Sequence, residues 1–177
     1  MIRNIIFATL ACLLLFTAAA FAATDAADFE LKDLKGKKVS LEDLLDNCNL
    51  LLIDFWQVGC KPCNELLPHL QDYLDEYGDK GLDVVIISRD TALTLGQVEP
   101  FFTSNKYTFR VLLDTDLEVS KDYGVKASPV TFIISPDGEL LYRHYNYKSG
   151  QEKEIEQFIK DFFAGKEVQA DLEAEQK

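Results

Sequence analysis

The sequence has little cysteine, glycine, proline and positive charge, and each shortage excludes a class of protein. Four cysteines in 177 residues are too few for a small domain held together by disulfides. With 9 glycines and 5 prolines, the chain is neither collagen-like nor a low-complexity linker. The 18 lysines and arginines are outnumbered by 30 acidic residues, and the net charge of −12 repels nucleic-acid phosphates. We therefore expect no nucleic-acid partner.

The chain does contain enough apolar material for one sizeable core. Hydrophobic residues make up 47% of the sequence and charged residues 27%, which is typical of a globular protein. A length of 177 residues corresponds to about one domain. No internal repeat is visible, so we expect a single domain.

Residues 1–22 have the pattern of a secretory signal. Arg3 is their only charged residue, and a nearly unbroken apolar run follows over residues 5–16. Ala20-Phe21-Ala22 then offers an A-x-A cleavage site. We expect an exported protein, in the periplasm or on the outer face of the cytoplasmic membrane. The alternative is an uncleaved membrane anchor, because the apolar stretch approaches the roughly 20 residues of a spanning helix.

The rest of the chain alternates strands with helices and ends in a hairpin and a helix. A first hairpin is expected around Gly36, followed by a helical turn capped by Ser40. Apolar runs of strand length lie at residues 50–56, 84–87, 109–113, 130–134 and 140–145. Helical spacing occupies residues 41–46, 62–77, 95–105 (interrupted at Pro100), 117–123 and 151–164. The order predicts an α/β domain over residues 28–164, with a mixed central β-sheet flanked by helices and a flexible polar tail at 165–177.

A Cys-x-x-Cys pair stands where the buried strand at 50–56 meets a helix, and it reads Cys60-Lys61-Pro62-Cys63. Free backbone N–H groups and the helix dipole favour a thiolate at Cys60, which is the form that attacks disulfides. Lys61 adds a positive charge, and Pro62 suits the first helical turn. The spacing lets Cys63 form a disulfide or resolve a mixed disulfide. Redox catalysis is therefore the favoured function.

Other uses of the cysteines fit less well. A zinc site needs a second ligand pair, but Cys48, His69 and His144 have no paired spacing. Haem attachment needs His directly after the second cysteine, where Asn64 stands. A purely structural disulfide of this span would constrain the unfolded chain little. We expect no metal and no organic cofactor, and we interpret Cys48 as a packing residue, with a third redox thiol as the alternative.

The segment that contains the two cysteines reads Asp54-Phe55-Trp56-Gln57-Val58-Gly59-Cys60-Lys61-Pro62-Cys63. It resembles the active-site segment of thioredoxins. The signal, the first hairpin and an extra strand and helix between residues 82 and 108 make the chain similar to the exported TlpA/ResA-like branch. The resemblance implies a thioredoxin-like fold with an N-terminal hairpin and a central strand–helix insertion.

The resemblance also implies roles for individual residues. Asp54 matches the buried acid that exchanges protons with the second cysteine, and Pro68 matches the proline that kinks the first helix. Ser128 and Pro129 match the cis-proline segment that faces the cysteines and lines the substrate groove. Trp56, Lys61 and Pro62 are the other substrate-binding candidates, beside the cysteines.

The residues themselves support part of these assignments and depart from others. A carboxyl group inside an apolar strand is costly to ionise, so the pKa of Asp54 should rise. Many TlpA/ResA-like proteins have a glutamate where this chain has Leu66, which weakens a specific role in cytochrome maturation. Thioredoxins usually have tryptophan where this chain has Gly59.

Together these features predict an exported thiol–disulfide oxidoreductase. Cys60 attacks a disulfide of an oxidised protein substrate, Cys63 resolves the mixed disulfide, and Asp54 handles the Cys63 proton. The resemblance implies a membrane-bound thiol–disulfide electron donor, and apocytochrome c among the substrates. The alternatives are a disulfide oxidant or isomerase, and a non-enzymatic thioredoxin-fold adaptor. A peroxidase of related fold is disfavoured, because its Thr-rich helix-start motif is absent.

Overall fold

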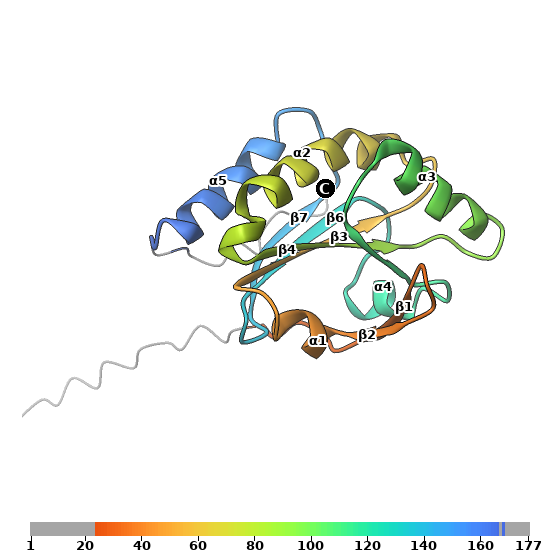
Figure 1. Ribbon diagram of the computed structural model, residues 1–177, viewed down its shortest axis with the longest axis horizontal. Helices are drawn as coiled ribbons and strands as arrows, with labels where there is room; N and C mark the ends of the chain where they lie inside the picture. The colour runs from red at the N-terminus through yellow and green to blue at the C-terminus, as the bar shows by residue number, and fades with distance from the viewer. Residues whose placement is uncertain (1–23, 167, 169–177) are drawn as a thin grey trace, which may run out of the picture.

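The computed structural model describes residues 24–166 and 168, and it contains one seven-stranded sheet with helices on both faces (Figure 1). The predicted signal at 1–22 and nearly all of the predicted tail lie outside the described residues. The strands are β1 (Glu30–Asp33), β2 (Lys38–Ser40), β3 (Leu50–Trp56), β4 (Leu82–Ser88), β5 (Arg110–Leu113), β6 (Val130–Ile134) and β7 (Leu140–Tyr145). Their order in the sheet is β2-β1-β5-β4-β3-β6-β7.

The sheet is mixed, as the sequence predicts. β3 pairs parallel with β4 and antiparallel with β6, and β4 pairs parallel with β5. The hairpins β1–β2 and β6–β7 add antiparallel pairs toward the two edges. All seven residues of β3 are buried, which explains why its sequence is apolar without alternation.

The helices form two layers around this sheet. They are α1 (Leu41–Leu45), α2 (Lys61–Tyr77), η1 (Gly78–Lys80), η2 (Leu95–Gln97), α3 (Val98–Asn105), α4 (Glu118–Asp122) and α5 (Glu152–Phe163). In Figure 1, α2, α3 and α5 cover one face and α1 and α4 the other. β3 supplies Leu52 and Trp56 to the core on the first face and Leu51 and Phe55 to the core on the second, as strand alternation requires. No helix of the described part is long and apolar enough to cross a membrane.

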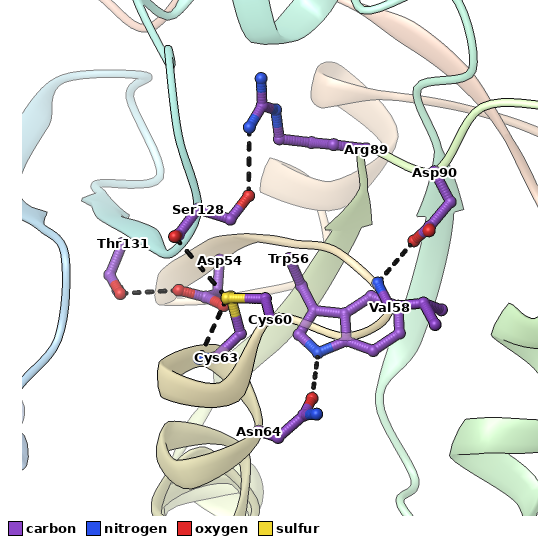
Figure 2. Close-up of a disulfide and its surroundings, with 10 residues drawn as sticks. All are labelled: Asp54, Trp56, Val58, Cys60, Cys63, Asn64, Arg89, Asp90, Ser128 and Thr131. Carbon is purple, nitrogen blue, oxygen red and sulfur yellow. Dashed lines mark hydrogen bonds between the residues drawn. A yellow bond between two sulfur atoms is a disulfide. The ribbon is translucent and has the colours of Figure 1, made fainter. Parts of the chain in front are cut away.

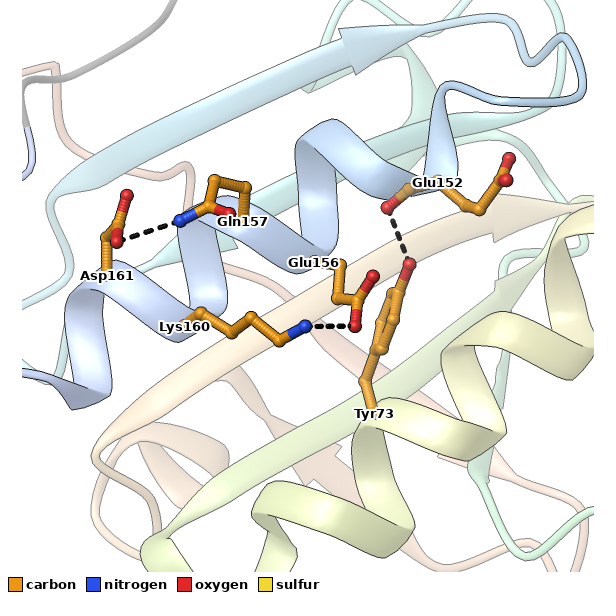
Figure 3. A network of polar contacts seen from close by, with 6 residues as sticks. All are labelled: Tyr73, Glu152, Glu156, Gln157, Lys160 and Asp161. Atoms are coloured by element: carbon orange, nitrogen blue, oxygen red, sulfur yellow. Dashed lines mark hydrogen bonds and ion pairs between the residues drawn. The ribbon is translucent and has the colours of Figure 1, made fainter.

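Helix α5 is fastened to α2, the helix that follows Cys60. The Tyr73 hydroxyl donates a hydrogen bond of 2.6 Å to the backbone oxygen of Glu152 (Figure 3). At the other end, the rings of Tyr77 and Phe163 stack with centroids 5.4 Å apart. Lys160 and Glu156 pair along α5 (Figure 3). These contacts hold both ends of α5 against the C-terminal part of α2.

Two local predictions have different outcomes. Ser40 caps α1 as predicted, and it forms a reciprocal capping box with Asp43. The predicted interruption at Pro100 is wrong, because Pro100 lies in the first turn of α3, where its missing N–H removes no helical hydrogen bond. The break comes earlier, where the 3-10 turn η2 passes into α3 at Val98.

Candidate active site

Cys60 and Cys63 form a disulfide at the start of α2, with their Cα atoms 5.3 Å apart (Figure 2). Cys60 is the N-cap residue, and the Cys63 backbone N–H donates to the Cys60 sulfur at 3.2 Å. Cys63 is fully buried, whereas Cys60 is partly exposed. Cys60 is therefore the sulfur that a partner protein can reach, and its position favours a thiolate.

Asp54 is fully buried on the face of the sheet that α2 covers. It has the same strand parity as Leu52 and Trp56, which pack in the core together with Cys63. The Thr131 hydroxyl donates a 2.8 Å hydrogen bond to Oδ1 of Asp54. Oδ2 is buried and has no hydrogen-bond partner among the described residues.

The burial of Asp54 has the electrostatic consequence that the sequence predicts. Loss of hydration penalises the charged carboxylate and raises its pKa to about 8, against a smaller lowering by the Thr131 hydrogen bond. A carboxyl group with this pKa holds a proton at neutral pH and exchanges it near neutrality.

The peptide bond between Ser128 and Pro129 is cis, as the resemblance implies. The backbone oxygen of Ser128 lies 3.6 Å from the Cys60 sulfur (Figure 2). The segment just before β6 therefore faces the partly exposed cysteine.

The structure corrects the assignment of Trp56 to the substrate-binding residues. The ring is fully buried and packs against Phe101 and Phe102, with centroids 4.9 Å apart in each case. Its Nε1–H donates to the side-chain oxygen of Asn64 at 2.9 Å (Figure 2). Since no part of the ring reaches the surface, Trp56 is a core residue that stabilises the start of α2 through Asn64.

Lys61 and Pro62 lie where the sequence places them, in the first turn of α2. The Lys61 side chain is 87% exposed, and its amine lies 3.7 Å from Glu65 one turn on. Glu65 thus offsets part of the positive charge beside Cys60. Pro68 lies inside α2, as predicted.

Sequence reasoning missed two polar residues at the end of β4, Arg89 and Asp90. Asp90 is fully buried, and its Oδ2 accepts hydrogen bonds from the Val58 backbone N–H and the Ser88 hydroxyl, both at 3.0 Å. Arg89 donates to the Ser128 hydroxyl at 3.2 Å (Figure 2). The sequence did offer a clue, because these two charged residues directly follow an apolar strand. The C-terminal ends of the parallel strands β3 and β4 lie together, so Arg89 and Asp90 lie at the same end of the sheet as Cys60.

Cys48 lies away from the disulfide, at the opposite end of β3. It is half-buried against the second core, and burial raises the pKa of its thiol to about 11. The seven residues of β3 separate it from Cys60 by roughly 20 Å, far beyond disulfide reach. The structure supports the packing interpretation.

The fold and the site define a thiol–disulfide oxidoreductase of thioredoxin-like fold, and comparison with known proteins agrees. Residues 22–143 match the model of the AhpC/TSA family. The thiol-disulfide oxidoreductase ResA of Bacillus thuringiensis subsp. konkukian is 31% identical over 137 residues, which are 77% of this chain and 75% of that protein. The thioredoxin-like protein YneN of Bacillus subtilis is 33% identical over 129 residues, 73% of this chain and 74% of YneN.

Solved structures show the same likeness. The crystal structure assigned as thiol:disulfide interchange protein DsbE from Chlorobium tepidum superposes with a TM-score of 0.72, at 28% identity, over 80% of this chain and 96% of that one. The chain belongs to the AhpC/TSA family and, within it, to the ResA-like thiol-disulfide oxidoreductases. Its substrates and redox partners are therefore proteins with thiols or disulfides.

Proposed function

We propose that this protein is an exported reductase of protein disulfides, with Cys60 as the attacking sulfur. The observation that carries the proposal is the asymmetry of the site. The first sulfur is partly exposed at a helix start, and the second is fully buried on the face that also holds Asp54. Such an asymmetry suits one sulfur for attack on a partner and the other for resolution.

The proposed cycle begins with the reduced protein. The Cys60 thiolate attacks one sulfur of a partner disulfide, which forms a mixed disulfide and releases the other partner sulfur as a thiolate. Asp54 accepts the proton of Cys63, and the Cys63 thiolate then attacks the Cys60 sulfur. The Cys60–Cys63 disulfide forms and the second partner sulfur leaves. The partner has gained two electrons and becomes a dithiol after protonation, while this protein is left oxidised.

In this proposal the substrate docks across the disulfide as an extended segment. The Ser128–Pro129 segment lies beside Cys60 and can offer backbone hydrogen bonds to such a segment. Lys61 and Pro62 directly follow Cys60 in the first turn of α2 and are the remaining candidates for substrate contact.

Export and partners complete the proposal. The pattern of residues 1–22 supports export, and a signal that is not cleaved would anchor the protein to the membrane. A membrane-bound thiol–disulfide donor would return two electrons to the Cys60–Cys63 disulfide. Apocytochrome c is among the exported substrates to test, since it presents a Cys-x-x-Cys pair.

The reduction potential of the Cys60–Cys63 pair tests the direction of electron flow. We expect a value near that of thioredoxin, about −270 mV, from equilibration with glutathione or dithiothreitol buffers. A value near about −120 mV, typical of a strong oxidant, would make the protein a source of disulfides instead.

Insulin reduction by dithiothreitol tests whether the protein is an enzyme for protein disulfides. Wild type should accelerate the reaction, and Cys60→Ser should abolish the acceleration. Equal rates for the two proteins would favour the adaptor, in which the disulfide is only structural.

A further inference from the structure

We propose that Arg89 and Asp90 are positioning residues that hold the two loops flanking Cys60 at a fixed spacing. The approach loop is residues 57–59, and the cis-proline loop is residues 125–129. The inference rests on the proposed function, and it concerns how the site fits a protein substrate. Figure 2 shows the two side chains leaving the end of β4 in different directions, Asp90 toward Val58 and Arg89 toward Ser128.

Asp90 holds the approach loop. Its Oδ2 accepts the Val58 N–H at 3.0 Å, two residues before Cys60. The Ser88 hydroxyl donates to the same oxygen at 3.0 Å and accepts the Asp90 N–H at 3.2 Å. The carboxyl group is fully buried, where a hydrogen bond is electrostatically stronger than in water. The path of the chain into Cys60 is thereby tied to β4.

Arg89 holds the cis-proline loop by two bonds. One terminal nitrogen donates to the Ser128 hydroxyl and the other to the Val125 backbone oxygen, both at 3.2 Å. Ser128 is the residue whose backbone oxygen lies 3.6 Å from the Cys60 sulfur. The fork of the guanidinium thus fixes the loop at two points, which a lysine amine on a flexible stem does not reproduce.

Arg89 is itself held in place. Its Nε–H donates to the Ser120 hydroxyl at 3.0 Å. That hydroxyl donates in turn to Oδ2 of Asp114 at 2.6 Å, and Asp114 is fully buried at the end of β5. The Arg89 backbone N–H also donates to the Trp56 backbone oxygen at 2.8 Å. Arg89 is therefore tied to β3 by its backbone, and its guanidinium is held by α4 and, through Ser120, by the end of β5.

The kinetic consequence depends on substrate size. A protein disulfide must fit between the two loops, so a shift of either loop should raise its KM. A small aromatic disulfide needs only an accessible Cys60 sulfur, so it should respond less. A role confined to stability would change both substrates alike.

The test compares insulin with 5,5′-dithiobis(2-nitrobenzoate) as substrates of Arg89→Gln and Arg89→Lys. We expect KM for insulin to rise about tenfold in both variants, with a change of less than about threefold for the small disulfide. The matched control is Arg110→Gln, since Arg110 is also an arginine at a strand end, 3.9 Å from Asp83. It should behave as wild type with both substrates.

Two further comparisons separate positioning from charge and from folding. In a Ser128→Ala background, Arg89→Gln should cost less than it does alone, because part of its action runs through the missing hydroxyl. Asp90→Ala should raise KM for insulin. Asp90→Asn should raise it less, because an amide oxygen can still accept the Val58 N–H. The Asp90 pair also serves if Arg89→Gln does not fold.

The proposal is overturned if Arg89→Lys keeps the wild-type KM, which would leave charge as the relevant property. It is overturned equally if insulin and the small disulfide lose activity in the same proportion. If wild type reduces insulin no faster than Cys60→Ser, the proposed function has failed, and that result is visible without any Arg89 variant.

Discussion

The carboxyl group of Asp54 receives a 2.8 Å hydrogen bond from Thr131 on the adjacent strand, while its second oxygen has no partner among the described residues. Burial therefore dominates, and it raises the pKa of Asp54 to about 8. One oxygen is held in place and the other is available for a proton.

Asp54→Asn should slow the reduction of a protein disulfide. For wild type, the rate should rise as the pH passes through about 8, because the carboxylate that accepts the Cys63 proton forms there. The variant should lose this rise and be slower by about 10²-fold or more. Stopped-flow rates between pH 6 and 9 measure both effects. An unchanged rate and pH profile would remove Asp54 from the mechanism.

The same substitution should change the pH dependence of stability. Below the ordinary pKa of 3.8, Asp54 is protonated in both the folded and unfolded protein. Between there and about 8, the unfolded chain loses the proton and the folded protein keeps it. The Asp54 contribution to the free energy of unfolding should then fall by about 1.4 kcal/mol per pH unit. Urea unfolding of oxidised wild type and Asp54→Asn should show the variant gaining relative stability over this window, and parallel curves would contradict the raised pKa.

Thr131→Val should shift the pH profile of the reduction rate without abolishing the rise. The Thr131 hydrogen bond lowers the pKa of Asp54, so its removal should shift the rise in rate to higher pH. Thr131→Ser keeps a hydroxyl and serves as the control, with the wild-type midpoint. A midpoint that moves to lower pH in the valine variant would show that the hydrogen bond does not stabilise the carboxylate.

Cys63→Ser should trap protein substrates on Cys60. The partly exposed first sulfur can still attack, but no second thiol is present to resolve the mixed disulfide. Non-reducing electrophoresis after incubation with oxidised insulin should show a covalent complex that dithiothreitol releases. Cys60→Ser leaves only the fully buried Cys63 at the site, and adducts formed equally by both variants would argue against the assigned order of attack.

Cys48→Ala should leave redox activity unchanged, because burial raises the pKa of the Cys48 thiol to about 11 and β3 separates it from the site. With the reduced protein at pH 7.5, iodoacetamide followed by peptide mass spectrometry should label Cys60 well before Cys48. Faster labelling of Cys48 would revive its interpretation as a third redox thiol.

Much of the fold could be predicted, because its signals are local. The strands at Leu50–Trp56 and Val130–Ile134 are apolar runs bounded by polar or glycine-containing segments, and the structure places both at the predicted bounds. The order of strands and helices then left few arrangements for the sheet. The pair at Cys60 and Cys63 was identified because it stands where a buried strand meets the start of a helix, a position that favours a thiolate.

The rest of the site depends on contacts between distant parts of the chain. The Arg89–Ser128 and Asp90–Val58 hydrogen bonds join residues 39 and 32 positions apart. Nothing in the local sequence specifies which loops will meet the end of β4. Trp56 was misassigned for the same reason, since Phe101 and Phe102 cover it from a helix far along the chain.

The sulfur of Cys60 also accepts the Cys63 backbone N–H in the first turn of α2, so redox chemistry alters the atom that caps this helix. A thiolate is a stronger hydrogen-bond acceptor than a disulfide sulfur, which favours the reduced form of the folded protein. Folding and reduction form a thermodynamic cycle. If the reduced protein folds more favourably than the oxidised protein, the folded protein has a higher reduction potential than the unfolded chain, and the two free-energy differences are equal. Any extra stability that the Cys60 cap gives to the reduced folded protein therefore appears as an equivalent rise in the reduction potential of the Cys60–Cys63 pair.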